Sequence, residues 1–225
     1  MARAKVGQCN GGTCVELSAG RALPARSWDR GVTVPDELQP DSEQSALLAR
    51  VAKGDGQAAA LLTDMIAPRV LRYAARMLGN RDEAEDVTQE AMLRLWRMAP
   101  DWEAGNAQPS TWVYRVAANL CTDRLRRRRP MAPELPDVAD EALTQDARMM
   151  QQARARALEA GLMQLPDRQR EAVILRHLEG LSNPEIAAIM MVGVEAVESL
   201  TARGKRKLAA ILAGEREALG YEDDI

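Results

Sequence analysis

Apolar residues recur every three or four positions over most of the chain, the spacing that places them on one face of an α-helix. The first such stretch begins near Ser42, and Gly54-Asp55-Gly56 interrupts it. A second stretch runs from about Gln57 to Leu78, and Pro68 within it is expected to kink or split that helix. No run of alternating β-branched residues indicates a strand. The pattern predicts an all-α fold.

Two more helices are predicted between Asn80 and the prolines near residue 130. Asn80 and Glu83 have the spacing of an N-terminal capping box, and Pro100 ends the helix that they start. After a polar loop, Ser110 is the expected N-cap of the second helix. The predicted inward stripes are Val87, Ala91 and Leu95 in the first helix and Val113, Val116, Ala117 and Leu120 in the second.

The C-terminal part has the pattern of a helix-turn-helix. A helix begins after Pro166, and Gly180 ends it. Ser182 and Glu185 again have capping-box spacing, at the start of a short helix. A turn over residues 191–193 then precedes a longer helix that ends in basic residues, an arrangement typical of DNA-binding modules. In that last helix the predicted buried stripe is Val194, Val197, Leu200, Leu208 and Ile211.

Charge is segregated along the chain, although its net charge is only −3. Residues 110–130 contain six arginines against one aspartate, whereas residues 133–146 and the C-terminal tail are acidic. This distribution indicates a local nucleic-acid footprint flanked by acidic segments. We therefore expect a flexible N-terminal arm (1–41), a helical domain (42–130), an acidic linker (131–146), a second helical domain (147–213) and an acidic tail (214–225).

Several function classes are not supported by the sequence. No stretch approaches 18 apolar residues, so we expect no membrane insertion and a cytoplasmic protein. The three cysteines, Cys9, Cys14 and Cys121, and the single histidine, His177, do not form a four-ligand zinc pattern. Reduced thiols are expected, with a redox- or metal-sensing arm as the alternative. Without a phosphate loop, nucleophile elbow or ligand cluster, we expect neither an enzyme nor a cofactor.

Three helices carry candidate chemistry. The acidic helix over residues 82–97 would repel DNA and is a candidate protein-binding surface, or merely a solvated face. The helix over residues 112–129 combines aromatics that can stack on unpaired bases with arginines that can hold phosphates. Its alternative is a core tryptophan followed by a solvated basic helix end. The last helix would enter a major groove, unless the helix pair serves only protein contact.

The sequence resembles the extracytoplasmic-function (ECF) sigma factors over about residues 43–212. Their polymerase-binding helix is similar to one segment of this chain, Asp82-Glu-Ala-Glu-Asp-Val-Thr-Gln-Glu-Ala-Met-Leu-Arg-Leu-Trp96. Their minus-ten helix is similar to a second segment, Ser110-Thr-Trp-Val-Tyr-Arg-Val-Ala-Ala-Asn119, followed by Asp123-Arg-Leu-Arg-Arg. The start of their minus-thirty-five domain is similar to three further segments, Leu165-Pro-Asp-Arg-Gln-Arg-Glu171, Leu178-Glu-Gly-Leu-Ser182 and Glu185-Ile-Ala-Ala.

The resemblance implies partners and residue roles. It implies binding to core RNA polymerase at the β′ clamp helices and the β flap, binding to promoter DNA, and inhibition by an anti-sigma factor. The implied polymerase-binding residues are Asp86, Gln89, Glu90, Leu93 and Trp96. The implied minus-ten residues are Trp112, Tyr114, Arg115, Asn119, Asp123 and Arg126. The implied minus-thirty-five residues are Ser182, Glu195, Ala196, Glu198, Ser199, Arg203, Lys205 and Arg206.

The chain departs from the family pattern in the helix-turn-helix. Met191 stands where the family commonly has glycine, and Gly193 replaces a usual serine or threonine cap. Either Met191 adopts a left-handed conformation, at a cost of about 1 kcal/mol, or the turn shifts so that Gly193 does. Glu198 stands where many relatives are basic, which weakens phosphate binding. The rival function is a DNA-binding regulator that acts without core polymerase, but such a protein needs no acidic polymerase-binding helix.

Overall fold

The computed structural model describes residues 43–102, 108–128 and 145–214, all within one compact unit that spans residues 34–225. Within these ranges every regular element is helical, which confirms the all-α prediction, and the helices form two domains. The predicted N-terminal arm, with Cys9 and Cys14, lies outside the described residues. So do most of the predicted linker and nearly all of the tail.

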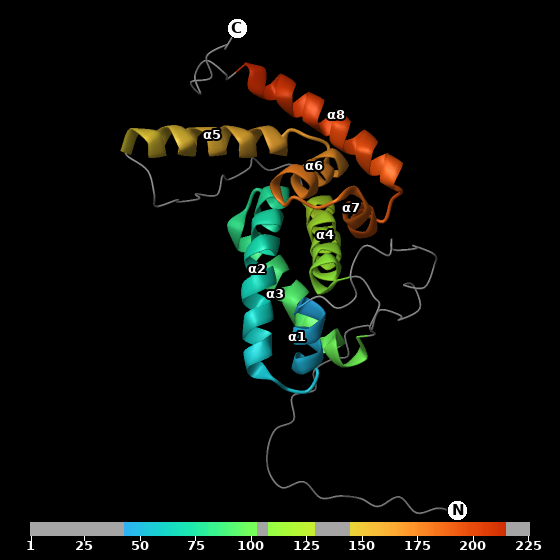
Figure 1. Cartoon of the computed structure of the whole chain (residues 1–225). Helices are drawn as coiled ribbons and strands as arrows, with labels where there is room; N and C mark the ends of the chain where they lie inside the picture. Colours follow the sequence, from blue (N-terminus) through green and yellow to red (C-terminus); the bar gives the residue numbers. More distant parts are fainter. Residues whose placement is uncertain (1–42, 103–107, 129–144, 215–225) are drawn as a thin grey trace, which may run out of the picture. The chain divides into compact units, whose positions relative to one another are not determined.

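The first domain contains α1 (Glu43–Val51), α2 (Gly56–Leu78), α3 (Arg81–Met98), the 3₁₀ turn η2 (Ala99–Asp101) and α4 (Pro109–Arg127). The long helix α2 packs against α1, α3 and α4 (Figure 1). Pro68 lies inside α2 but does not split it, contrary to one of the two outcomes expected. Buried Ile66 and Val70 on either side of the proline hold the helix to its neighbours despite the lost backbone hydrogen bond.

Local capping interactions set the ends of these helices. Gly79, with φ 62°, ends α2, and the Asn80 side chain accepts a hydrogen bond of 2.9 Å from the backbone N–H of Glu83, which confirms Asn80 as the N-cap of α3. The prediction of Ser110 as a cap is wrong, because α4 begins at Pro109. Proline suits the first turn of a helix, where its missing N–H leaves no bond unmade. The Ser110 N–H instead donates to the Gln44 side chain on α1, at 3.1 Å.

The second domain contains α5 (Gln145–Met163), α6 (Asp167–Val173), the π-helical turn η3 (Ile174–Leu178), α7 (Asn183–Met190) and α8 (Val194–Ala213). Helices α5, α6 and α7 all pack against α8. The predicted capping box is confirmed: Ser182 caps the N–H of Glu185, and the Glu185 carboxylate accepts from the Ser182 N–H at 2.8 Å. Val194 is 41% exposed, so its place in the buried stripe is wrong, and the buried side of α8 begins at Val197.

The turn of the helix-turn-helix is strained at one residue. Met191 has φ 55° and ψ 47°, the left-handed conformation, whereas Gly193 has φ −71°. The first of the two predicted alternatives is therefore the one adopted. Outside glycine, this conformation costs about 1 kcal/mol. The Met191 side chain is 60% exposed, so burial within its own domain does not offset that cost.

Two backbone features of the second domain were not predicted. Gly204 lies so close to α6 that an added Cβ would stand 3.0 Å from the backbone oxygen of Gln169. Between α6 and α7, the π-helical turn η3 widens the helix, and the Glu179 N–H donates to the Ile174 oxygen at 3.0 Å. Gly180 then leaves the turn with φ 73°, as its predicted role at a helix end requires.

Candidate protein and nucleic-acid interfaces

Five of the six predicted minus-ten residues share one face of α4. Successive residues of an α-helix are rotated by about 100°, so positions 112, 115, 119, 123 and 126 fall within one narrow stripe. Asn119 and Arg126 on this stripe are exposed, and Trp112, Arg115 and Asp123 are partly exposed. The arrangement presents an aromatic ring, an amide and guanidinium groups together, which suits stacking and hydrogen bonding to unpaired bases.

Trp112 joins this stripe to the domain core. Its ring meets that of Trp102 edge to face, with centroids 6.3 Å apart, and it packs against the buried cluster. The indole nitrogen is buried and has no hydrogen-bond partner among the described residues. Burial also lowers the pKa of the neighbouring Arg115 guanidinium. The two alternatives for Trp112 therefore combine, because one part of the ring is core and another part faces the stripe.

Tyr114 lies on the opposite side of α4 and is buried in this structure, so its contact with minus-ten DNA stays a prediction. It is two residues from Trp112, a rotation of about 200°, and only 1% of it is exposed. Its ring packs edge to face on Tyr73, with centroids 5.6 Å apart. Burial beside Glu179 raises the Tyr114 pKa. In this arrangement Tyr114 cannot touch DNA, because protein covers it.

The basic end of α4 divides into two groups. Arg126 and Arg127 are exposed, and Arg126 forms a surface ion pair of 2.6 Å with Asp123. Arg124 and Arg128 instead turn toward α3. Only part of the arginine run is therefore available to phosphates in the described structure.

The predicted polymerase-binding residues all lie on α3. Asp86 and Gln89 are exposed, Glu90 and Trp96 are partly exposed, and Leu93 is 40% exposed. The exposed carboxylates of this face would repel DNA phosphates, so a protein is the better-suited partner. Some of the acidity is balanced internally, because Glu90 pairs with Arg94 at 2.7 Å and Glu85 pairs with Arg81 at 3.0 Å.

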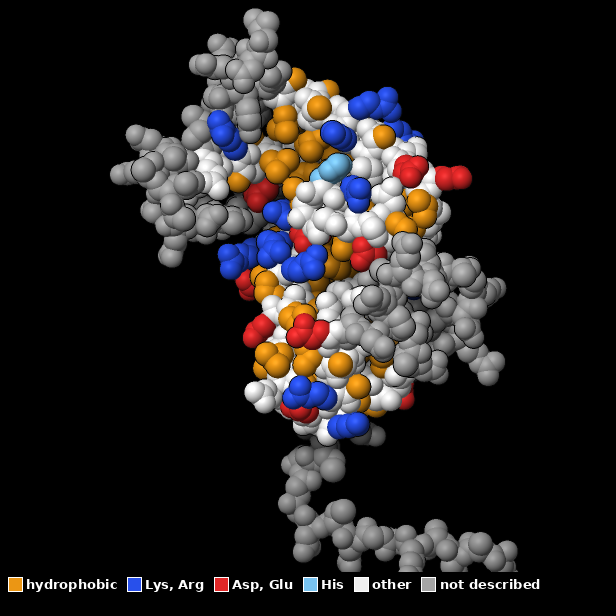
Figure 2. Space-filling view, in the orientation of Figure 1, with side chains coloured by type: hydrophobic (Ala, Val, Ile, Leu, Met, Phe, Trp, Pro, Cys, Tyr) orange, Lys and Arg blue, Asp and Glu red, His pale blue; other side chains and the backbone are white. Residues whose placement is uncertain are grey.

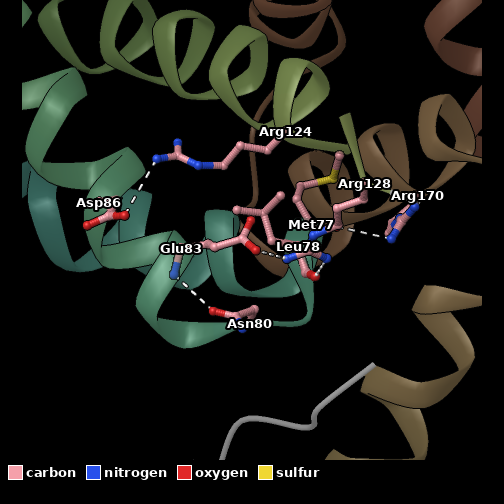
Figure 3. A network of polar contacts seen from close by, with 8 residues as sticks. All are labelled: Met77, Leu78, Asn80, Glu83, Asp86, Arg124, Arg128 and Arg170. Carbon is pink, nitrogen blue, oxygen red and sulfur yellow. Dashed lines mark hydrogen bonds and ion pairs between the residues drawn. The ribbon is translucent and has the colours of Figure 1, made fainter. Parts of the chain in front are cut away.

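A polar network joins α3 to the end of α4 (Figure 3). Arg128 contacts the Glu83 carboxylate at 2.8 Å and donates to the Leu78 backbone oxygen, while Arg124 lies 3.7 Å from Asp86. The Asn80 cap lies beside these pairs. The candidate polymerase-binding helix and the candidate minus-ten helix are thus held together by charge as well as by packing.

The first turns of α8 carry the predicted minus-thirty-five residues. Glu195, Ala196, Glu198 and Ser199 are all exposed, as are Arg203, Lys205 and Arg206 further along the helix. Ser182 is committed to capping α7, which leaves it partly buried. Asn183 donates to Glu198 at 3.3 Å, linking the two helices. Figure 2 shows both acidic and basic side chains on the face drawn, with several basic side chains side by side across its middle.

The structure adds a residue that the sequence did not single out. The Glu179 side chain is buried, and it contacts Tyr114 of α4 and Arg76 of α2. Arg170, 3% exposed, likewise crosses between the domains and donates to the Met77 backbone oxygen at 3.0 Å. Neither contact follows from helical periodicity, because the partners are between 65 and 103 positions apart in the sequence. The one available signal was that both residues lie in the quoted family motifs.

Three findings concern the cysteine, possible metal ligands and membrane spans. Cys121 is fully buried, and burial raises the pKa of its thiol to about 12, which leaves it unreactive. Among the described residues, no cluster of three or more possible metal ligands occurs. None of the helices in the same part of the chain is long and apolar enough to span a membrane.

Comparison with known proteins identifies the family. The model of Sigma-70 region 2 matches residues 62–130, and the model of Sigma-70 region 4 matches residues 155–208. The ECF RNA polymerase sigma factor SigW of Bacillus subtilis is 32% identical over 174 residues, which cover 72% of this chain and 92% of SigW. The ECF sigma factor SigE of Mycolicibacterium smegmatis is 34% identical over 189 residues, which cover 80% of this chain and 73% of SigE.

A solved structure shares the fold. The structure of CnrH in complex with the cytosolic domain of CnrY superposes with a TM-score of 0.60 at 24% identity, covering 76% of this chain and 98% of that one. The fold agrees with the sequence comparisons. It has the paired α3 and α4 and the helix-turn-helix of α7 and α8, and the sequence matches both Sigma-70 regions and is similar to SigW and SigE. This chain belongs to the ECF RNA polymerase sigma factors.

Proposed function

We propose that this sigma factor binds core RNA polymerase through α3, reads the minus-ten element through the exposed stripe of α4, and reads the minus-thirty-five element through α8. The observation that carries the proposal is the pairing of two unlike surfaces in one domain. The acidic face of α3, with exposed Leu93, suits a protein partner, and the α4 stripe beside it suits unpaired bases. The Glu83–Arg128 pair holds these helices in a fixed relation.

The proposed residue roles follow the geometry. Asp86, Gln89, Glu90, Leu93 and Trp96 dock on the β′ clamp helices. Trp112, Arg115, Asn119 and Arg126 face the minus-ten strand, and Asp123 orients Arg126 through their ion pair. In α8, the exposed residues 195, 196, 198 and 199 face base edges, while Arg203, Lys205 and Arg206 contact phosphates. The second domain also contacts the β flap.

The placement of Glu195 and Glu198 affects DNA binding. Carboxylates at the exposed start of α8 repel phosphates but can accept a hydrogen bond from the amino group of cytosine. We therefore expect weak, salt-sensitive binding of the free second domain and a preference for cytosine in part of the minus-thirty-five element. Tight promoter binding then depends on both domains acting together on polymerase.

The polymerase-binding role is tested by measuring the affinity for purified core enzyme. Leu93→Ala removes the exposed apolar side chain from α3 without leaving a core cavity. We expect affinity to fall roughly 5- to 30-fold, the effect of losing about 1–2 kcal/mol at an interface. The matched control is Leu61→Ala, a leucine of similar exposure on α2. Equal affinity for both variants would argue against α3 as the docking surface.

We also propose regulation by an anti-sigma factor in the cytoplasm, and no catalytic activity of the chain itself. A solved complex with a similar fold supports the regulation: the sigma factor RpoE of Bartonella quintana was determined with the anti-sigma factor NepR. CnrH, whose fold is also similar, was determined with the cytosolic domain of CnrY. The domain limits of 42–130 and 147–213 remain part of the proposal, and the matched family regions lie within them.

A further inference from the structure

The Glu179 carboxylate lies at the point where the two domains meet. The Tyr114 hydroxyl on α4 donates to Oε2 of Glu179 at 2.8 Å, and Nη1 of Arg76 on α2 donates to Oε1 at 3.2 Å. Arg69 of α2 donates to the backbone oxygen of the same glutamate at 3.1 Å. Only 1% of the Glu179 side chain is exposed. Three groups of the first domain therefore converge on one residue of the second.

The backbone around Glu179 is shaped for this contact. The π-helical turn η3 shifts Glu179 out of the register that a continuing α-helix would give it, and Gly180 leaves the turn in a left-handed conformation. Such turns are uncommon in helices and are frequent at functional sites. An ordinary helix end would place a glutamate in water, where its charge is most stable.

Met191 provides a second unusual contact between the domains. Its sulfur accepts a hydrogen bond of 3.1 Å from Nη2 of Arg115, a residue of the proposed minus-ten stripe. The residue that makes this contact is the one strained residue of the helix-turn-helix turn. At both positions, a residue of the second domain in a locally unfavourable state contacts α4. Glu179 carries a buried charge, and Met191 has a positive φ.

The chemistry of the contact makes it reversible. A buried carboxylate loses its hydration, and its hydrogen bonds and ion pair offset that loss only while all partners are in place. When the domains separate, water can replace Tyr114 and Arg76 around the carboxylate. The interface also has apolar packing, because α4 packs against α7 and buried residues of both domains belong to one hydrophobic cluster. The polar contacts therefore hold the domains together with that packing, and losing them shifts the balance toward separation.

We propose that Glu179 is the anchor of a latch that holds the two domains closed on each other in the free chain. The closed form occupies Arg115 of the proposed minus-ten stripe through Met191, and it holds the other side of α4 through Tyr114. The consequence for DNA rests on the proposed function: because only the open form binds well, the apparent affinity is reduced by the fraction of chains that are open. The latch itself is independent of polymerase and promoter.

Single-molecule energy transfer within the full chain tests the latch without either partner. Dyes are attached at Asp64→Cys on α2 and Lys207→Cys on α8, both exposed positions outside the proposed binding residues. Cys9 and Cys14 are changed to serine, and buried Cys121 does not react. The latch predicts one high-efficiency population in the parent chain. Glu179→Gln and Arg76→Gln should each raise the low-efficiency population at least about fivefold, since each removes the same charge-assisted contact.

The controls separate opening from unfolding and from charge. Arg72→Gln makes the same charge change on an exposed part of α2, one turn from Arg76, and should change the populations far less than Arg76→Gln, because Arg72 acts on Tyr114 only through its charge. Circular dichroism should show full helical content in every variant. Combining Arg76→Gln with Glu179→Gln should add little to either change alone, because the two residues share one contact. Unchanged populations in both single variants, or fully additive effects, would overturn the latch.

A second measurement tests the consequence for DNA. Arg76→Gln removes a positive charge, so without a latch it should bind a labelled pool of random single-stranded DNA no more tightly than Arg72→Gln does. With the latch, Arg76→Gln should bind more tightly than Arg72→Gln, by the same factor as its increase in open molecules. Opening without any gain in affinity would overturn the gating of DNA binding.

Discussion

Asn119 and Tyr114 show how helical phase decides which residues of α4 are available. They lie five positions apart, a rotation of about 140°, and Asn119 is exposed whereas Tyr114 is buried. The motif alone placed both on the DNA-facing surface. Counting angles from the buried stripe of Val113 and Ala117 could have removed Tyr114 from that surface. No count of angles could have found its partner Glu179, because that contact joins distant parts of the chain.

Asn119→Ala should reduce discrimination among minus-ten sequences without weakening polymerase binding. The exposed amide can pair with the edge of one unpaired base, and losing such a pair is worth about 1–3 kcal/mol, or roughly 5- to 150-fold in specificity. The check is to compare transcription from an active promoter and from single-base variants of its minus-ten element, alongside affinity for core enzyme. A parallel loss of both properties would show that Asn119 has a structural role.

Met191→Gly should stabilise the second domain, since glycine adopts a positive φ without the steric cost that methionine bears. The expected gain is about 1 kcal/mol in the free energy of unfolding by denaturant. Met191→Ala is the matched variant, because it also removes the contact with Arg115 but retains the strained conformation. A glycine variant no more stable than the alanine variant would mean that the turn is unstrained.

At the scale of elements, the apolar period and the capping residues predicted most helices within a residue or two. Asn80 and Ser182 succeeded because a cap is a local interaction between close neighbours. Ser110 failed because Pro109, one residue earlier, also fits a helix start. The π-helical turn at Ile174–Leu178 has no sequence period of its own, and it depends on contacts with α2 and α7 that are remote in the sequence.

The crossing of α8 over α6 requires glycine at position 204. An added methyl group would stand 2.6 Å from a side-chain carbon of Val173 and 3.0 Å from the Gln169 oxygen. Such overpacking costs about 1–3 kcal/mol, more than the 1 kcal/mol or so that alanine gains in a helix. Gly204→Ala should therefore lower the thermal midpoint of the full chain. Gly56→Ala, with open space around it, should not, and equal midpoints would mean that the helices adjust freely.

At the scale of the whole molecule, segregated charge predicted a nucleic-acid footprint flanked by acidic segments, but it gave no view of the contacts that charged residues make within the chain. The sequence shows acids on α3 and arginines on α4 separately. The structure pairs Glu83 with Arg128 and so couples a proposed polymerase-binding helix to a proposed DNA-binding one. It also places Glu179 between the domains. Both are long-range contacts, which a period or a local motif does not encode.

Run-off transcription with purified core RNA polymerase and a library of promoter sequences tests the central claim most directly. If α3 recruits polymerase while α4 and α8 read DNA, adding this chain should produce transcripts from a restricted set of promoters that share two elements. Core enzyme alone should not produce them, and Leu93→Ala should reduce them. If the chain neither binds core enzyme nor yields promoter-specific transcripts, the proposed function is wrong.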